Sequence, residues 1–546
     1  MDERPGSGSA GGPDDGRPPA EVHAAYSPPF RRQRIVPDPY VVVSPDALQQ
    51  FNARILDPET AVRIPGQPPI RSTVYIADRL IVSGEVTQEN QGLLARAAEL
   101  EGLSLRAPGD DAHGTTANLS RQAGLHDEPM LFSHVVHLDP AGTDPAKPAD
   151  AWKVLQRYRT MITREDRGQQ HVALDHLMTA TPHVFGSPHV FGSPHVFGSP
   201  YGMPGWGSRQ PVNWVGQLPP RTPDEALRCR RPVVAVLDTG CGRHPWLPNN
   251  IVLRNPSIMG VPLGLHDPNT DPENTGVIDD PLTGEIDPDA GHGTFIAGLI
   301  RQICPDANIM AVRVMSSSGA VAESDVLYAL KRLLVRQTLA QAANDARGII
   351  DVISLSLGYY HELPEDLTFD PQLLYPLRGL SEAGVSVVVA AGNDATSRPM
   401  FPAAFTPYPG GNVGAFDRNC VPLISVGALN PDRTISLFSN AGPWVACHRP
   451  GSMLVSTLPI TFDGSEQPAN LLYVPGDGWR ADIDPDNFSA GFGIWSGTSF
   501  AAPVLAGQIA QDLFEGDGGS IDPPDRAAAI DRCWNSITKR VGVDRP

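Results

Sequence analysis

The chain has 546 residues, of which 41% are hydrophobic, and a formal net charge of −19 at pH 7. Because this length exceeds the size at which one hydrophobic core usually stops growing, we expect two domains with linkers. The negative charge disfavours nucleic acid and anionic membrane surfaces as partners, since both would repel an acidic body.

Neither export nor membrane insertion is indicated by the sequence. The N-terminus has no basic end followed by an apolar stretch, and no segment approaches the roughly 18 unbroken apolar residues of a membrane helix. The six cysteines lack Cys-x-x-Cys spacing, which suits reduced thiols better than a disulfide framework or a zinc site. We therefore expect a soluble protein that stays in the cytoplasm.

The N-terminal part of the chain divides into two segments of different composition. Residues 1–38 are rich in Gly, Pro, Ser and Asp with few large apolar groups, so we expect them to be disordered. Residues 39–180 carry regular apolar patterns and are predicted to form a small α+β domain. The predicted elements are strands over 74–82 and 130–138 and helices over 88–103 and 149–158.

A low-complexity linker is expected over residues 181–220. It contains the sequence His-Val-Phe-Gly-Ser-Pro three times in succession, at 183–188, 189–194 and 195–200. A six-residue period is too short for a helical repeat, and a proline in each copy interrupts any regular ladder. The three histidines could gather a metal, but the repeat has no acidic or thiol ligand, so we expect none there.

Residues 221–546 alternate short apolar runs with helical patterns. Continuous β-branched runs suit strands covered on both faces, so we predict an α/β domain with a doubly wound, mainly parallel sheet flanked by helices. Ligand sites in such sheets lie beyond the carboxyl ends of the strands, where Asp238 falls. The predicted elements are strands over 233–237, 308–314, 352–357, 385–390 and 423–428, and helices over 324–344, 371–383 and 499–513.

Three motifs in this domain carry the residues of a nucleophilic hydrolase. Asp238 lies in Asp-Thr-Gly, His292 in His-Gly-Thr and Ser499 in Gly-Thr-Ser-Phe-Ala-Ala-Pro. A serine nucleophile needs a base to take its proton, and the base needs a carboxylate to orient it. Singly, these residues could be a turn carboxylate, a loop histidine and a helix-capping serine. Together and in this order they indicate an Asp-His-Ser catalytic triad.

The order of the triad and its flanking residues resemble the subtilisin-like serine peptidases, from about residue 232 to about residue 507. The resemblance implies a serine endopeptidase that cuts peptide bonds through an acyl-enzyme on Ser499, without a cofactor for the chemistry. It also implies that the side-chain amide of Asn393 and the backbone N–H of Ser499 form an oxyanion hole.

The same resemblance implies where a protein or peptide substrate binds. The substrate backbone would pair, as an added strand, with Ser356, Leu357 and Gly358. Ala390, Ala391 and Gly392 would form the facing wall of the main specificity pocket.

The N-terminal domain resembles the prodomains of many such enzymes, whose tail lies through the active-site cleft. Its last residues, 174–180, are weakly similar to such a tail. If the chain cuts itself, the bond after Ala180 is more plausible than the bond after Thr181, because Pro182 follows the latter. The alternative is a permanent regulatory domain that binds a protein partner and controls activation.

Three insertions are expected to approach the cleft and to restrict the choice of substrate, since loops carry specificity. They cover residues 406–419, residues 460–492 and an acidic stretch from Asp267 to Asp289 that includes Glu273. Oxygen-rich loops can hold calcium, and structural calcium is an alternative here. The stretch lacks the spacing of a twelve-residue calcium loop and contains prolines, so we expect a solvated flap instead.

Two further alternatives come from the same residues. A catalytically silent protein could use the cleft only to hold peptides, but no triad residue is missing from the motifs. Cys241, three residues after Asp238, lies either close to the catalytic centre or in the core as a small buried filler.

Overall fold

The computed structural model describes most of the chain between residues 43 and 546, and all of the described residues belong to the unit Asp38–Pro546. The predicted disordered segment 1–38 and the three repeats lie outside the described residues. The described residues are 43–82, 88–106, 112–125, 133–141, 148–162, 172–180, 209–279, 281–282, 284, 286–363, 372–409, 417–464, 471–481, 488, 490–516 and 525–546.

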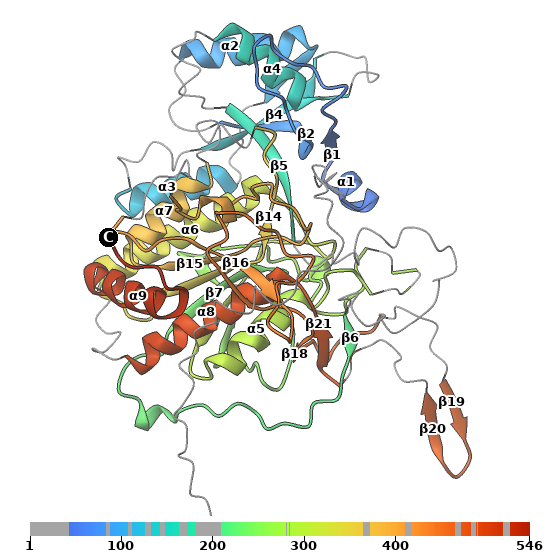
Figure 1. The fold of residues 1–546 in the computed structure, drawn as a ribbon. Helices are drawn as coiled ribbons and strands as arrows, with labels where there is room; N and C mark the ends of the chain where they lie inside the picture. Colours follow the sequence, from blue (N-terminus) through green and yellow to red (C-terminus); the bar gives the residue numbers. More distant parts are fainter. Residues whose placement is uncertain are drawn as a thin grey trace, which may run out of the picture. The chain divides into compact units, whose positions relative to one another are not determined.

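A seven-stranded sheet forms the centre of the C-terminal part of the chain (Figure 1). Every strand pair in it is parallel, and the order is β17-β16-β15-β13-β7-β11-β8. This confirms the predicted α/β class with a mainly parallel sheet. The strands are β7 (Val233–Asp238), β8 (Val252–Arg254), β11 (Asn308–Arg313), β13 (Val352–Leu355), β15 (Ser386–Ala390), β16 (Ile424–Leu429) and β17 (Cys447–Pro450).

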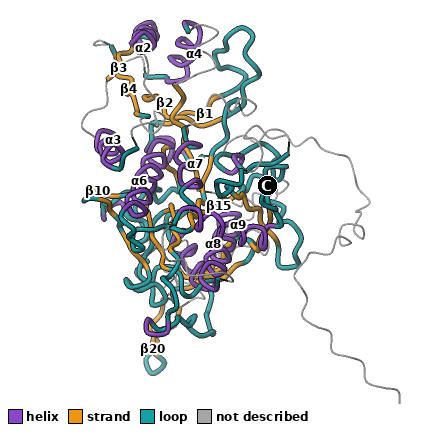
Figure 2. The backbone as a smooth tube through the Cα atoms, turned by 90° about the vertical axis from the view of Figure 1, so that its left-hand side faces the viewer, coloured by secondary structure: helices purple, strands orange, loops and turns teal. Residues whose placement is uncertain are grey.

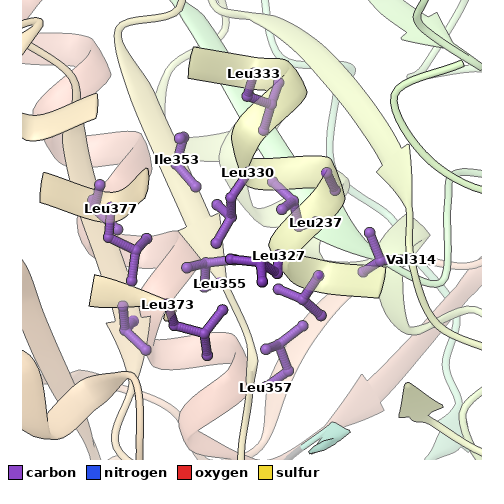
Figure 3. Packing of buried hydrophobic residues seen from close by; sticks show 14 of the residues in the cluster. Leu237, Val314, Leu327, Leu330, Leu333, Ile353, Leu355, Leu357, Leu373 and Leu377 are labelled. Carbon is purple, nitrogen blue, oxygen red and sulfur yellow. The ribbon is translucent and has the colours of Figure 1, made fainter. Parts of the chain in front are cut away.

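Helices cover both faces of this sheet because its strands are apolar on both sides. In β7, Leu237 packs into one core with residues of α6 and α7, and Val236 packs into another with residues of α5, α8 and α9. Figure 3 shows Leu327 and Leu330 of α6 in the first core, near Leu237 and Leu355. The helices are α5 (His292–Ile303), α6 (Glu323–Ala342), α7 (Leu374–Glu382), α8 (Thr498–Glu515) and α9 (Arg526–Val541).

The N-terminal elements form a second, antiparallel sheet with its own core. Its order is β12-β5-β2-β4-β3, in which β12 (Ala320–Ala322) comes from the C-terminal part of the chain, and β1 pairs with β2. The helices α2 and α4 contribute Leu94 and Leu155 to a core shared with Leu80 of β2. This confirms the predicted α+β character. The elements are α1 (Pro45–Gln50), β1 (Ala53–Leu56), β2 (Thr73–Val82), α2 (Gln88–Leu100), β3 (Leu103–Arg106), α3 (Ala112–Gln122), β4 (His134–Pro140), α4 (Ala151–Met161) and β5 (Val172–Ala180).

The helix predicted over 88–103 was too long. It ends at Leu100, and Gly102 adopts φ 75°, a left-handed conformation that only glycine tolerates readily. The chain then reverses into β3, which pairs with β4. The strand predicted over 130–138 begins at His134 among the described residues, and residues 130–132 lie outside them.

Most of the remaining strands form three small sheets of their own, β18-β21-β6, β9-β10 and β19-β20, whereas β12 and β14 pair with β5. Helix α3 contacts α6, beside which it lies in Figure 2. None of the described helices is long and apolar enough to cross a membrane. The remaining elements are β6 (Gln210–Pro211), η4 (Asp224–Ala226), β9 (Ser257–Ile258), β10 (Val261–Pro262), η5 (Pro268–Thr270), β12 (Ala320–Ala322), β14 (Leu357–Gly358), η7 (Ala403–Phe405), β18 (Leu454–Thr457), β19 (Leu471–Val474), β20 (Gly478–Ala481) and β21 (Phe492–Trp495).

One short segment within the predicted linker 181–220 contacts the C-terminal part of the chain. Strand β6 pairs with β21, and the buried guanidinium of Arg209 donates hydrogen bonds to the carbonyl oxygens of Ala290 and Asp287. The residues that follow are mostly exposed, for example Val215 and Leu218. The predicted domain boundaries stay predictions.

Candidate active site

Asp238 and His292 meet at the carboxyl end of β7. Asp238 is the last residue of that strand, and its Oδ1 lies 2.7 Å from Nδ1 of His292, the first residue of α5. The same oxygen accepts a hydrogen bond of 2.8 Å from the backbone N–H of Thr239. Both side chains are buried. An imidazole held in this way has its Nδ1–H committed to the carboxylate, so Nε2 is the nitrogen that can accept a proton.

The surroundings of His292 favour its charged form. Burial lowers the pKa of His292, but the carboxylates of Asp238, Asp289 and Glu273 together raise it by more, so the pKa lies above its ordinary value. Nε2 of His292 is buried and makes no hydrogen bond to any described residue. The ring therefore combines a raised affinity for a proton with an acceptor nitrogen not engaged by the described part of the chain.

Ser499 lies at the N-terminus of α8, and this helix packs against α5. The ring of the next residue, Phe500, lies with its centroid 5.1 Å from that of His292, which brings the serine segment beside the imidazole. The hydroxyl of Ser356 donates a 2.9 Å hydrogen bond to the carbonyl oxygen of Ser499 and so fixes the backbone at this point. The first turn of α8 is thus held between β13 and the Asp238–His292 pair.

Asn393 is oriented by the residue that precedes Ser499. Its Oδ1 accepts two hydrogen bonds of 2.9 Å from Thr498, one from the backbone N–H and one from Oγ1. Because the oxygen is engaged, the orientation of the amide is set, and Nδ2 is buried without a hydrogen-bond partner among the described residues. A fixed N–H donor beside the serine segment can stabilise a developing oxyanion.

The predicted pocket wall is a tightly packed turn at the end of β15. The side chains of Ala390 and Ala391 are buried, and the N–H of Gly392 donates a 3.0 Å hydrogen bond to Oγ1 of Thr498. Gly392 adopts φ 103°, and a Cβ atom there would lie 2.2 Å from Nδ2 of Asn440. Only glycine fits this position. The hydrogen bond from Gly392 to Thr498 holds the wall against the segment that carries Ser499.

Strand β5 occupies the position predicted for a substrate strand. It pairs antiparallel with β14, with Leu357 opposite Ala180 and Gly358 opposite Thr179, and on its other edge with β12. The N–H of Ala180 donates a 2.6 Å hydrogen bond to the carbonyl oxygen of Gly319. Of the residues predicted to bind the substrate backbone, Leu357 and Gly358 therefore contact the N-terminal domain, as Figure 1 shows for β5 and β14.

A buried charge cluster joins β5 to the residues around it. His176 of β5 lies between two carboxylates, with Nδ1 2.7 Å from Glu323 Oε2 and Nε2 3.0 Å from Glu362 Oε2. Burial lowers the pKa of His176, but the two carboxylates raise it by more, so the pKa lies well above its ordinary value. An ionised carboxylate can only accept, so the imidazole donates a hydrogen bond to each carboxylate when both of its nitrogens carry a proton. His176 is therefore an imidazolium held between two carboxylates.

The acidic stretch between Asp238 and His292 is only partly a solvated flap: Asp267 and Asp279 are exposed, but the expectation was wrong for three other carboxylates. Glu273, Asp287 and Asp289 are buried. The Asp287 carboxylate accepts hydrogen bonds from the N–H groups of Ile278 and Asp279, and both oxygens of Glu273 are bonded to threonine hydroxyls. The oxygens of Glu273 and Asp287 are already engaged by protein donors, which makes them poor calcium ligands. Structural calcium at the other acidic residues of the stretch stays an alternative.

Among the described residues, the group that could gather around a metal is His176, His361 and Glu362. The two nitrogens of His176 already face carboxylates, and Nδ1 of His361 accepts a 2.9 Å hydrogen bond from the N–H of Leu363. Ion pairing and hydrogen bonds therefore account for these contacts without a metal.

The six cysteines are free thiols, and Cys241 is a buried filler. Burial raises the pKa of the Cys241 thiol to about 12, so it stays protonated at neutral pH. A protonated thiol is a poor nucleophile. The thiol packs in the core and also lies near Glu273 and Thr294, so the two placements expected for Cys241 do not exclude each other.

Sequence comparison identifies the family. The profile described as the subtilase family matches residues 230–515, which is more than half of the chain and includes Asp238, His292 and Ser499. This chain belongs to the subtilase family.

Individual subtilases resemble the chain over part of its length. The "Major intracellular serine protease" of Bacillus subtilis (strain 168) is 26% identical over 292 residues, which is 51% of this chain and 66% of that protein. The "Intracellular serine protease" of Paenibacillus polymyxa is 27% identical over 251 residues, 42% of this chain and 61% of that protein. The chain thus spans somewhat less than two thirds of the length of these subtilases.

A solved structure also resembles the chain. The cold adapted subtilisin-like serine proteinase is 21% identical, covers 57% of this chain and 83% of its own, and gives a TM-score of 0.33.

Sequence motifs did not reveal two parts of this subtilase site. Prolines and other carboxylates surround Glu273 in the sequence, and that pattern predicts a solvated acid. The sequence around His176 predicts only a prodomain-like tail. Glu323 and Glu362, which face His176, lie 147 and 186 residues further along the chain. No local pattern links residues so far apart.

Proposed function

We propose that this subtilase is a serine endopeptidase in which Ser499 is the nucleophile, His292 the general base and Asp238 the residue that orients the base. The observation that supports this proposal is the 2.7 Å contact between Asp238 Oδ1 and His292 Nδ1, which leaves Nε2 as the proton acceptor. The serine segment lies against the same imidazole. The names of the similar subtilases, which are serine proteases, agree with it.

In the first half of the reaction, the Ser499 hydroxyl attacks the carbonyl carbon of the substrate while its proton passes to Nε2 of His292. The carbonyl oxygen becomes an oxyanion that accepts hydrogen bonds from Nδ2 of Asn393 and the N–H of Ser499. Collapse of the tetrahedral intermediate breaks the C–N bond, and His292 returns the proton to the leaving amine. The product is an acyl-enzyme on Ser499.

In the second half, water attacks the acyl-enzyme and His292 takes a proton from it. Collapse of the second tetrahedral intermediate releases the carboxylic acid and returns the proton to Ser499. Asp238 stabilises the imidazolium in both halves and does not itself become protonated. No cofactor takes part in these steps.

The substrate backbone is proposed to bind as β5 does, as an antiparallel strand between β12 and β14. Main-chain hydrogen bonds then supply affinity and side-chain contacts supply specificity. The three predicted insertions favour a restricted choice of substrates, since loops carry specificity. Since β5 already pairs with Leu357 and Gly358, this domain must be released or cut before a substrate can bind. Self-processing after Ala180 and release by a protein partner are the two routes, and the cytoplasm is the proposed location.

A serine-directed fluorophosphonate tests this function. The full chain is incubated with the reagent before and after a period that allows self-processing, and intact mass is measured at each stage. The wild type is expected to gain one phosphonyl group on Ser499, whereas Ser499→Ala is expected to gain none. Equal labelling of the two proteins, or no labelling of a wild type whose N-terminal domain has been removed, would contradict the proposal.

The side chain of Asn393 provides a second test, on the oxyanion. Asn393→Ala is expected to lower kcat by roughly 100-fold to 1,000-fold with little change in KM, because the lost hydrogen bond forms in the transition state. Asn393→Asp is the matched variant. It keeps an oxygen that accepts from Thr498 but replaces the donor with a carboxylate, so its kcat should fall at least as far. A rise in KM alone would show that Asn393 binds substrate and does not stabilise the oxyanion.

A further inference from the structure

The side chain of Glu273 is buried directly behind the Asp238–His292 pair. It is 1% exposed, although it comes from a loop of acidic residues. Its Oε1 accepts a hydrogen bond of 2.5 Å from Oγ1 of Thr239, and its Oε2 accepts one from Oγ1 of Thr294. Both oxygens of one buried carboxylate are therefore committed to two threonine hydroxyls.

Each threonine belongs to the segment that carries a catalytic residue. Thr239 follows Asp238, and Thr294 lies two residues after His292 in the first turn of α5. The hydroxyls also cross between the segments, since Thr239 Oγ1 accepts from the N–H of Gly293 at 2.8 Å and Thr294 Oγ1 accepts from the N–H of Gly242 at 2.7 Å. Glu273 is thus the common acceptor of a hydrogen-bond network that joins the two segments.

The hydroxyl of Thr239 has two acceptors for one proton. Its Oγ1 lies 2.5 Å from Oε1 of Glu273 and 3.2 Å from Oδ1 of Asp238. When Glu273 is ionised, it can only accept, so the Thr239 proton points toward it. When Glu273 is protonated, it can donate to Thr239, whose proton is then free to point toward Asp238. An additional hydrogen bond to the Asp238 carboxylate reduces its stabilisation of the charged form of His292 and so lowers the pKa of His292.

We infer that Glu273 is a positioning residue for the Asp238–His292 pair, acting through the hydroxyls of Thr239 and Thr294. This inference rests on the proposed function, because it assigns Glu273 a part in the same reaction. In its ionised form Glu273 fixes both catalytic segments and leaves Asp238 to His292. In its neutral form Glu273 donates a hydrogen bond to Thr239, and the Thr239 hydroxyl can then donate a hydrogen bond to Asp238.

The charged and titratable groups around Glu273 come from every side of it. Asp238 and Cys241 approach from the end of β7, His292 from α5, Arg313 from the end of β11, and Asp271 from the same loop as Glu273. Burial raises the pKa of Glu273 to about 7 against the opposing effect of the threonine hydrogen bonds, with Asp271 and Asp238 raising it further. The carboxyl therefore changes charge in the range where His292 acts.

The test compares the full-length wild type with Glu273→Gln, Glu273→Asp and Asp267→Asn. Asp267→Asn is the matched control, because it removes one negative charge from an exposed position of the same loop. The first readout is the pH titration of the downfield Nδ1 proton of His292, followed by NMR, which does not require hydrolysis. The second is the pH dependence of the rate of labelling by the fluorophosphonate. Melting temperatures confirm that each variant is folded.

Glu273→Gln is expected to lower the titration midpoint of His292 by about half a pH unit, a threefold loss in proton affinity, because a nearby negative charge is removed. The labelling profile should move to lower pH by the same amount. Glu273→Asp keeps the charge, so its titration midpoint should stay closer to that of the wild type. The midpoint of Asp267→Asn should equal that of the wild type.

Equal midpoints in all four folded proteins would overturn the inference. A wild type that never reacts with the fluorophosphonate while Glu273→Gln still lowers the midpoint would contradict the proposed function and support the positioning role. A wild type that reacts, with the profile of Glu273→Gln unchanged, would overturn the positioning role alone.

Discussion

Replacing Ser499 by alanine is expected to lower peptide hydrolysis by about a millionfold, the magnitude seen when a triad hydrolase loses its nucleophile. Without the hydroxyl there is no oxygen to form the acyl-enzyme, and His292 has no proton to take. The residual rate would come from substrate binding and from the oxyanion donors, of which Asn393 is held by Thr498. Turnover of a peptide by the processed enzyme measures the effect.

A double variant sharpens this prediction. Ser499→Ala, His292→Ala and the combination of both are expected to lose about the same activity, because the residues act as a unit and their effects are not additive. Ser496→Ala is the control just before the motif, since its hydroxyl accepts a hydrogen bond from the N–H of Met453 at 2.8 Å and is given no part in the proposed reaction. Losses that add up in the double variant would contradict a shared proton-transfer step.

Replacing His176 by leucine is expected to release β5 from its position between β12 and β14. The substitution removes the imidazolium and leaves the carboxylates of Glu323 and Glu362 buried close to each other. Breaking a buried pair by removal of one partner costs about 3 to 5 kcal/mol, so the equilibrium for docking of β5 should shift by more than 100-fold. Faster labelling of Ser499 and faster proteolysis within β5 would report the release.

The control for this prediction is His137→Leu, the same substitution on β4, where the histidine is only partly buried. It should change neither the labelling rate nor the proteolysis of β5. If both variants behave like the wild type, the charge cluster does not hold β5 in place.

The same cluster predicts how docking depends on pH. Burial lowers the pKa of His176, but Glu323 and Glu362 raise it by more, so the pKa in the docked state lies well above 6.5. A group whose pKa is raised in the docked state contributes stability that is fully present below about pH 6.5 and is lost as the pH rises through the raised value. Docking should weaken by up to tenfold per pH unit in that range. His176→Leu should lack this dependence.

Other charged groups near His176 do not reverse the expected direction, in which docking of β5 weakens as the pH rises. Glu323 faces Nδ1 of His176 from α6, and Glu362 faces Nε2, while Arg159 of α4 approaches Glu362 at 3.8 Å. The pKa of Glu362 lies below its ordinary value because His361, His176 and Arg159 outweigh the effect of burial. Glu362 therefore stays ionised across the range in which His176 releases its proton. A docking equilibrium unchanged between pH 6 and pH 10 would contradict this account.

The sequence alone determined the α/β class, the order of the main elements and the family. Continuous apolar runs such as 233–237 and 385–390 are a local pattern. They predict strands covered on both faces without knowledge of which strands pair. The motifs around Asp238, His292 and Ser499 are local too, since each consists of a few neighbouring residues. For the same reason the local Ala-Gly-Asn sequence is enough to predict Asn393 as an oxyanion donor.

Tertiary structure alone decided which distant groups meet. Glu273 lies among acidic residues and prolines in the sequence, but folding buries it against Thr239 and Thr294. Strand β5 was recognised as a tail, yet its pairing with β12 and β14, and the two carboxylates at His176, depend on contacts across more than 140 residues. A pattern of neighbours predicts whether a residue belongs to a strand or a helix. The charge state of a buried group depends on what folding places beside it, and that information is not local.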